Sequence, residues 1–315
     1  MINKDLEKYI TRCFADNRDF ATGFLDMFKE YSKTEINSFE DYENAPNNFW
    51  SFLQSRLSQV KEYFPKANKE TLLRRGELYK NILENNNKSS HQLYVDTVNK
   101  ASSNKDIHVL DVGPGNMAYS SVLLGRDYAE VSAMDREFRV SDIALKKLNV
   151  NAREEFFKKS TNIKKYDMVV GCMPCGAIDK IVYLCAKNNK PYLIKTCTCE
   201  MPTTAEFYKR WGIAKELSEH STNNTKHDVR TVVNGDWFGW GDMLVELDPN
   251  MHCFGNYVYN VEDNEGVTKF LKERDNKLQS KVPKISFGNV VGRIEVVETS
   301  LSKEPWIADD EKEID

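Results

Sequence analysis

No apolar run in the 315-residue chain approaches the ~20 residues that a helix needs to cross a bilayer. The opening residues, MINKDLEKYI, likewise lack the apolar core of a secretory signal. The seven cysteines are odd in number and cluster as C-x₂-C and C-x-C, which indicates reduced, catalytic or metal-binding thiols rather than a disulfide framework. Together these features predict an intracellular, cytoplasmic protein with no membrane partner.

The chain also lacks an excess of positive charge, because 44 Lys and Arg face 48 Asp and Glu for a net charge of −4. A nucleic-acid partner would therefore need a local basic face. Residues 146–165 offer one candidate for such a face, although a solvated helical face is the favoured explanation of this stretch. Its basic residues are Lys146, Lys147, Arg153, Lys158, Lys159, Lys164 and Lys165.

Residues 1–100 are expected to form a helical N-terminal extension. Apolar side chains recur every three or four residues between Phe49 and Phe64, which places them on one face of a helix that Pro65 ends. A second stripe of this kind runs from Leu72 to Leu83, and the polar run 85–90 predicts a loop.

From about residue 105 the pattern changes to short apolar strands that alternate with helical segments. Strands are expected at 108–112, 131–134, 168–170 and 192–195, with a poorly marked one near 149–152, and helices at 119–124 and 204–217. This alternation predicts an α/β fold with a Rossmann-like, doubly wound, mostly parallel sheet that binds ligands at the carboxyl ends of its strands. A β-rich part should follow, with strands at 229–233, 243–247, 257–261 and 290–297, before an acidic end expected to be disordered.

The segment 108–117, HVLDVGPGNM, is the most informative stretch. An apolar run ends at Asp111, and two glycines follow just before a helical segment. Glycine tolerates the dihedral angles of such a turn and lets backbone N–H groups approach a ligand closely. The next apolar run ends at Asp135, about 20 residues past the first glycine, where an acid binds ribose hydroxyls. The two features predict a site for an adenosine cofactor.

Two families use a turn of this kind. The nicotinamide fingerprint G-x-G-x-x-G/A is satisfied formally by Gly113, Gly115 and Ala118. Asp111 argues for the other family, because this position is usually apolar in dinucleotide folds. A carboxylate there suggests a cation on the ligand, such as an α-amino group.

Over residues 105–200 the chain resembles the class I S-adenosylmethionine-dependent methyltransferases. The acid-x-G-x-G motif of that family is matched by Asp111-Val-Gly113-Pro-Gly115, its second acid by Asp135, and its fourth motif by the segment 166–175. The chain departs from the family at Met117, where a third glycine is common. The resemblance implies a methyltransferase domain over 101–315, with a cofactor half at 105–200 and a β-rich tail at 229–300.

The resemblance also implies which residues hold S-adenosylmethionine. Asp111 and the turn would bind the methionine end, Asp135 the ribose, and three residues after the fourth strand would flank the adenine or the methyl group. The turn residues are Gly113, Pro114, Gly115, Asn116 and Met117, and the residues after the strand are Gly171, Cys172 and Met173.

The acceptor is left open between two kinds of RNA chemistry. The segment Tyr192–Lys195 resembles the strand and lysine of RNA ribose 2′-O-methyltransferases, in which an ammonium stabilises the developing alkoxide. That family carries an aspartate where this chain has Cys172. Glu200 is a candidate for the missing acid.

Two cysteine motifs resemble those of RNA cytosine C5-methyltransferases instead. Pro174-Cys175 and Thr196-Cys197 follow the fourth and fifth strands, as in that family. By this resemblance Cys197 would be the thiolate nucleophile that adds to the base, and Cys175 would help to release the product. Cys172 again replaces an aspartate of the family, and the connection between the two motifs is shorter.

The cysteines also allow a structural interpretation. Cys172, Cys175, Cys197 and Cys199 could close a tetrahedral zinc site, or they could simply be buried thiols near a cofactor. We assign no metal ligand from the sequence.

The sequence therefore predicts an S-adenosylmethionine-dependent methyltransferase whose acceptor is RNA. The aromatic segment 236–242 could stack a base of such an acceptor or cap the substrate pocket, although a packed β-turn is the favoured interpretation. A small-molecule O- or N-methyltransferase, which the acidic isoelectric point favours, is one alternative. A non-catalytic relative that binds the cofactor or a protein partner is the other. Neither the acceptor atom nor the oligomeric state follows from the sequence.

Overall fold

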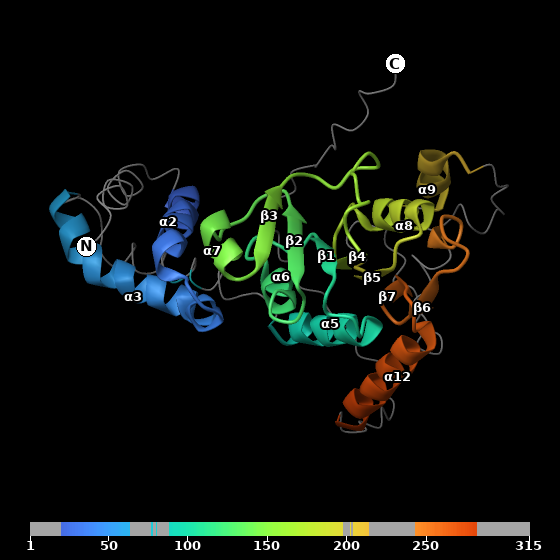
Figure 1. The fold of residues 1–315 in the computed structure, drawn as a ribbon. Helices are drawn as coiled ribbons and strands as arrows, with labels where there is room; N and C mark the ends of the chain where they lie inside the picture. The colour runs from blue at the N-terminus through green and yellow to red at the C-terminus, as the bar shows by residue number, and fades with distance from the viewer. Residues whose placement is uncertain are drawn as a thin grey trace, which may run out of the picture. The chain divides into compact units, whose positions relative to one another are not determined.

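The computed structural model describes residues 20–63, 77, 80, 88–197, 202, 204–213 and 243–281 (Figure 1). Residues 1–275 form one compact unit and residues 276–315 a second. Apart from residues 276–281, everything described belongs to the first unit. Outside the described residues lie the expected strands at 229–233 and 290–297, the segment 236–242, the stripe from Leu72 to Leu83 except residues 77 and 80, Cys199, Glu200 and the acidic end.

A seven-stranded mixed sheet with the order β3-β2-β1-β4-β5-β7-β6 forms the centre of the first unit (Figure 1). Its parallel strands are β1 (His108–Val112), β2 (Glu130–Asp135), β3 (Val150–Glu154), β4 (Met168–Cys172) and β5 (Tyr192–Lys195). Strand β7 (Tyr257–Asn260) pairs antiparallel with β5, and β6 (His252–Phe254) pairs antiparallel with β7. The expected α/β, Rossmann-like, mostly parallel fold is confirmed, including the poorly marked third strand.

The helices that follow the strands have clear local causes. Helix α6 (Tyr119–Leu124) follows the glycine turn, and α7 (Asp142–Lys147) begins at Ser141, whose hydroxyl accepts a hydrogen bond from the Ala144 N–H at 3.2 Å. Helix α8 (Ile178–Asn188) ends at Asn189 in the left-handed conformation. Helix α9 is Thr204–Trp211.

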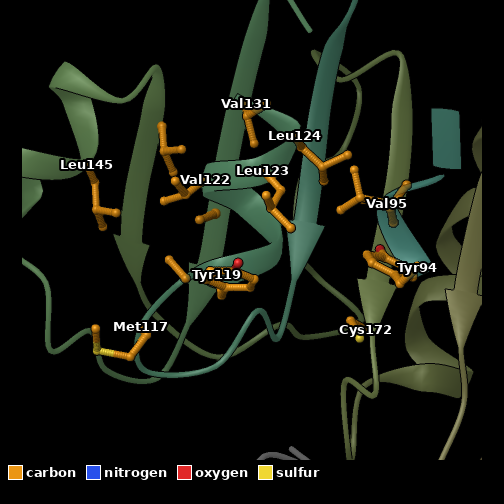
Figure 2. Packing of buried hydrophobic residues seen from close by; sticks show 14 of the residues in the cluster. Tyr94, Val95, Met117, Tyr119, Val122, Leu123, Leu124, Val131, Leu145 and Cys172 are labelled. Carbon is orange, nitrogen blue, oxygen red and sulfur yellow. The ribbon is translucent and has the colours of Figure 1, made fainter. Parts of the chain in front are cut away.

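Successive strand residues point to opposite faces of the sheet and enter two apolar clusters. Val109 packs in the cluster that contains α6 and helix α5 (Lys88–Ala101), whereas Leu110 packs in the cluster that contains α8. Figure 2 shows α6 residues of the first cluster lying against the strands. By the same alternation Asp111, Cys172 and Lys195 belong to the face that α5 and α6 cover.

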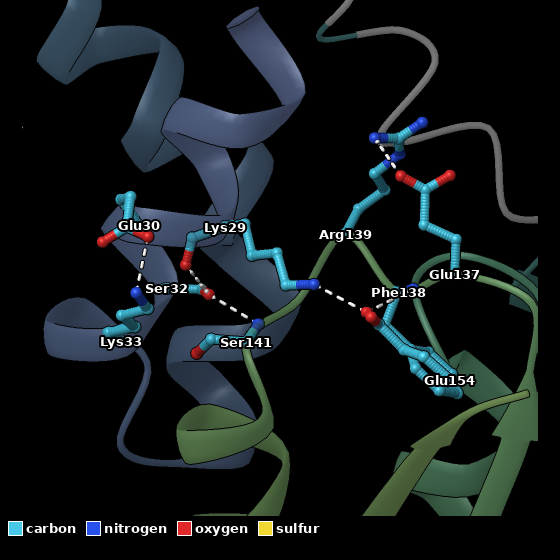
Figure 3. Close-up of polar contacts among 9 residues, drawn as sticks. All are labelled: Lys29, Glu30, Ser32, Lys33, Glu137, Phe138, Arg139, Ser141 and Glu154. Atoms are coloured by element: carbon cyan, nitrogen blue, oxygen red, sulfur yellow. Dashed lines mark hydrogen bonds and ion pairs between the residues drawn. The ribbon is translucent and has the colours of Figure 1, made fainter. Parts of the chain in front are cut away.

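The N-terminal helices are α2 (Phe20–Glu35) and α3 (Phe39–Tyr63), and polar contacts tie α2 to the edge of the α/β unit (Figure 3). The Ser141 N–H donates to Ser32 Oγ at 2.9 Å, and Lys29 Nζ pairs with Glu154 Oε1 at 2.6 Å. Glu154 ends strand β3, so α2 touches the carboxyl edge of the sheet, where ligands bind in this fold class.

Three local expectations were wrong: the strand at 243–247, the loop at 85–90 and the end of helix α9. Residues 243–247 form a helical turn instead of a strand, because the Asp248 N–H bonds back to the carbonyl of Leu244 at 3.0 Å. The expected loop at 85–90 overlaps α5, which already begins at Lys88.

Helix α9 ends at Trp211 instead of reaching residue 217. Gly212 follows with φ +62°, and the Ile213 N–H bonds back to the Tyr208 carbonyl at 2.9 Å, which is a typical glycine C-terminus.

Helix α12 (Asn264–Lys281) closes the described part of the chain. No helix within the described ranges is long and apolar enough to cross a membrane.

Candidate functional site

The two glycines after β1 have different roles. Gly113 adopts φ +68°, and a Cβ atom there would lie 2.9 Å from the Cα of Pro174 in the loop after β4. Gly115 adopts φ +80°, and no atom of the described residues beyond its chain neighbours lies within 4 Å of the position its Cβ would take. The first glycine therefore lets the turn pack against the β4 loop, and the second leaves the backbone open to a ligand.

Within the rest of the turn, Pro114 and Met117 are buried and Asn116 is exposed. Met117 belongs to the apolar cluster and is drawn with it in Figure 2, so its side chain serves packing.

Asp111 lies completely buried beneath this turn. Its Oδ2 accepts hydrogen bonds from the hydroxyls of Ser120 and Ser121, both at 2.7 Å. Its Oδ1 is buried without a hydrogen-bond partner among the described residues. Burial raises the pKa of the carboxyl from 3.8 to about 7. An unpartnered buried carboxylate oxygen is costly, and a cationic donor on a ligand would satisfy it.

Asp135, at the end of β2, is linked to the same turn. One carboxylate oxygen accepts the Gly115 N–H at 2.9 Å and the other accepts the Arg136 N–H at 2.7 Å. Partial burial raises the pKa of this carboxyl. The backbone N–H of Glu137 also hydrogen-bonds to this carboxylate. An ionised carboxylate offers about four acceptor positions, so the side chain can still accept from a ligand hydroxyl.

The ends of β4 and β5 form the other half of this edge. Cys172 lies opposite Lys195 in the strand register, and the Met173 N–H donates to the Lys195 carbonyl at 2.7 Å. Burial raises the pKa of the Cys172 thiol to about 12, so this thiol is neutral. Lys195 Nζ donates to the hydroxyl of Ser90 on α5. The lysine is therefore held at the edge by a side-chain partner.

Cys175 and Cys197 meet at this edge with their sulfur atoms 3.0 Å apart. Cys175 is exposed and Cys197 partly buried. In the described part of the chain no group of three or more His, Cys, Asp or Glu residues is arranged to hold a metal ion. The four-cysteine zinc site includes Cys199, which lies outside that part.

Helix α5 brings residues to this edge that the sequence reasoning missed. His91 Nδ1 and Tyr94 Oη are both buried without hydrogen-bond partners among the described residues. Burial lowers the pKa of His91 and raises that of Tyr94, and the neighbouring charges of Lys195 and Asp111 respectively add to these shifts. The sequence did carry a signal for these two residues. His91 and Tyr94 are spaced i, i+3, and they lie on the same helix face as the buried Val95 and Val98.

Helix α3 is attached to the glycine turn itself. The Tyr42 hydroxyl donates to the carbonyl of Met117 at 2.6 Å, and the Tyr119 hydroxyl donates to Glu43 Oε1 at 2.6 Å. The Tyr42 and Tyr119 rings are stacked with centroids 6.0 Å apart. The N-terminal helices therefore support the turn that the sequence singled out.

We expect Tyr42→Phe to lower the free energy of unfolding by about 1–2 kcal/mol, because it leaves the Met117 carbonyl without its buried donor. Urea denaturation measures this loss. Tyr183→Phe is the matched control and should cost almost nothing. Among the described residues, the Tyr183 hydroxyl makes one hydrogen bond, which it accepts from the exposed Lys187 Nζ at 3.5 Å. Equal stability of the two variants would contradict a supporting role for α3.

Comparison with known proteins gives only distant structural likenesses. No family model matches the chain, and no curated protein matches it. A precorrin-6y C5,15-methyltransferase from Geobacter metallireducens GS-15 is 18% identical over 33% of this chain and 60% of its own, with a TM-score of 0.28. The 23S rRNA methyltransferase ErmE is 18% identical over 41% of this chain and 53% of its own, with a TM-score of 0.26.

The magnesium protoporphyrin IX methyltransferase of Synechocystis PCC 6803, whose structure has bound S-adenosylhomocysteine, is 17% identical over 42% of this chain and 69% of its own, with a TM-score of 0.29. The chain spans about half to three-fifths of the length of the first similar structures. The names cover small-molecule and ribosomal RNA methyltransferases alike. Because these TM-scores are low, we assign the fold from the strand order of the sheet and not from the similarity to these structures.

Proposed function

We propose that the chain is an S-adenosylmethionine-dependent methyltransferase. The observation that carries this proposal is the buried, unpartnered Oδ1 of Asp111 beneath an open glycine turn that Asp135 also contacts. An ammonium group is the donor that a buried carboxylate accepts best. A ribose hydroxyl suits the remaining acceptor position of Asp135.

The residues present fit this cofactor. Asp111 would hold the α-amino group, Asp135 the ribose, and the turn the rest of the methionine end. Gly171, Cys172 and Met173 would border the adenine or the methyl group. The cofactor, when bound, supplies an electrophilic methyl group. The chain itself has to orient the acceptor, and orientation alone contributes roughly 7–11 kcal/mol to such reactions.

We further propose that the acceptor is RNA and approaches the ends of β4 and β5. Support for cytosine comes from the 3.0 Å contact of Cys175 and Cys197, since base methylation of that kind needs both thiols at one ring. Support for a ribose hydroxyl comes from Lys195, which Ser90 holds at the same edge. Cys172 is a neutral thiol and supplies neither nucleophile nor acid–base group.

A small-molecule acceptor is the second candidate, and the basic stretch 146–165 favours it. Only Lys146 and Lys147 of this stretch lie on a helix, so it is not one helical face. Lys147 is bound to Asn37 at 2.7 Å, and Arg153 to the Tyr166 hydroxyl at 2.8 Å. These side chains are engaged within the protein, which reduces the charge available for a phosphate backbone.

Calorimetry of the full chain with S-adenosylhomocysteine tests the cofactor. Saturable binding with one molecule per chain is expected, and a folded protein that shows no binding would overturn the proposal. Transfer of a labelled methyl group to RNA, protein and metabolite pools then identifies the acceptor. Lys195→Ala and Cys197→Ala, assayed separately, divide ribose from base chemistry.

The affinity for S-adenosylhomocysteine should rise with pH up to about pH 7 and then level off. The pKa of Asp111 is about 7, and only the carboxylate can bind an ammonium group, so below that pH binding must release a proton. Each pH unit below the pKa then costs up to about tenfold in affinity. Calorimetry between pH 5.5 and 8.5 in two buffers of different ionisation enthalpy measures both quantities. A pH-independent affinity without proton release would contradict an Asp111–ammonium contact.

A further inference from the structure

Two cysteines in the segments that follow β4 and β5, Cys175 and Cys197, are in contact through their sulfur atoms. Their sulfur atoms are 3.0 Å apart, although 22 positions separate them in the sequence. A disulfide needs the sulfurs to approach to about 2.05 Å, so the two sulfur atoms would have to move about 1 Å closer.

The backbone near both cysteines is held in place. The Met173 N–H donates to the Lys195 carbonyl at 2.7 Å, and each cysteine lies two residues beyond one member of this pair. The Cys175 N–H bonds to the Met173 carbonyl at 2.8 Å, and the Thr196 N–H bonds to the Asn256 carbonyl at 2.7 Å. The two thiols are therefore presented to each other by fixed segments, which raises their effective concentration.

Accessibility distinguishes this pair from the third thiol nearby. Cys175 is exposed and Cys197 partly buried, so a small reagent reaches the first sulfur directly. Cys172 is buried, and its raised pKa of about 12 leaves it almost entirely as the unreactive thiol. Oxidation at this edge should therefore be selective for the contacting pair.

We propose that Cys175 and Cys197 are a modification site at which low-molecular-weight disulfides form an intramolecular disulfide that cross-links the ends of β4 and β5. The thiolate of Cys175 attacks the reagent disulfide and forms a mixed disulfide, which releases one thiol. The thiolate of Cys197 then attacks the Cys175 sulfur and releases the second thiol. Each cysteine loses one proton, and the reagent takes up the two electrons.

The cross-link would close the edge at which we place the acceptor. The disulfide would convert the thiol of Cys197, the proposed nucleophile of base methylation, into an unreactive form. It would not involve any residue of β1 or β2. The site itself does not depend on methyl transfer, because it rests only on the thiol contact and on the exposure of Cys175.

Peptide mapping of the oxidised full-length protein tests the proposal. Reduced, desalted protein is treated with oxidised glutathione and digested with trypsin without reduction. The expected product joins the peptides 166–180 and 196–209, and its fragment spectrum places the bond between Cys175 and Cys197. Cys175→Ser and Cys197→Ser should each lower the yield by about tenfold or more, whereas the matched controls Cys172→Ser and Cys199→Ser should retain it.

Two results would overturn the proposal: glutathione adducts on both cysteines without a cross-link, or an unchanged cross-link in Cys175→Ser. Binding of S-adenosylhomocysteine by the oxidised and reduced protein separates this proposal from the proposed function. Equal affinity of both forms is expected. If neither form binds, the methyltransferase proposal fails while the mapped disulfide still stands.

Discussion

Asp111→Asn is expected to lower the affinity of the chain for S-adenosylhomocysteine by on the order of 10- to 100-fold, the worth of a charge-assisted hydrogen bond. The amide oxygen can still accept from the hydroxyls of Ser120 and Ser121, so the packing around the side chain is kept. The amide nitrogen then occupies the position of Oδ1 and presents a donor to the ligand's ammonium group. Calorimetry at pH 8 measures the loss.

The pH dependence of stability provides the folding control for this variant. In the wild type the folded state keeps a proton on Asp111 that the unfolded state loses between pH 3.8 and about 7. The free energy of unfolding therefore falls as pH rises through that window, by up to about 4 kcal/mol, and the variant lacks this slope. A folded variant that loses the slope but binds S-adenosylhomocysteine as tightly as the wild type would refute the assigned role of Asp111.

The second large effect is expected at the first glycine of the turn. Gly113→Ala should lower the free energy of unfolding by about 3–5 kcal/mol, because it combines an unfavourable φ of +68° with a Cβ atom 2.9 Å from the Cα of Pro174. Backbone atoms cannot rotate away from this contact. Urea denaturation at constant pH measures the change.

Gly115→Ala is the matched control in the same turn. Its φ of +80° costs about 1–2 kcal/mol, but within the described part of the chain its Cβ would meet no atom closer than 4 Å apart from its chain neighbours. The added methyl group would instead lie where the ligand approaches, so affinity for S-adenosylhomocysteine should fall more than stability does. Equal destabilisation by the two substitutions would mean that the contact with Pro174 contributes nothing.

The parallel strands and the glycine turn could be predicted from the sequence because their signals are local. An apolar run that ends in an acid and two glycines marks β1 and its turn, and Asp135 marks the end of β2. Two predictions were wrong because of local backbone hydrogen bonds: the strand expected at 243–247 and the extension of α9 to residue 217. There the chain bonds back to residues three to five positions earlier, and apolar spacing alone does not reveal this.

The part played by the N-terminal helices could not be predicted, since it depends on contacts between distant segments. Tyr42 reaches Met117 across 75 positions, and Lys195 reaches Ser90 across 105. From the sequence, the first 100 residues were predicted to be a helical extension. The domain boundary at residue 100 stays a prediction. In the folded chain, α3 and α5 contribute directly to the edge that carries the candidate site.

By itself the sequence determined the fold class and the place of the glycine turn after β1, since strand periodicity and glycine dihedral angles are properties of a few consecutive residues. Only the tertiary structure decided which side chains of these segments are buried and which of them are in contact. Burial of Asp111 leaves one of its oxygens without a partner, and the adjacent ends of β4 and β5 bring Cys175 within 3.0 Å of Cys197. Solvent exclusion and proximity arise between segments far apart in the chain, and no local pattern specifies them.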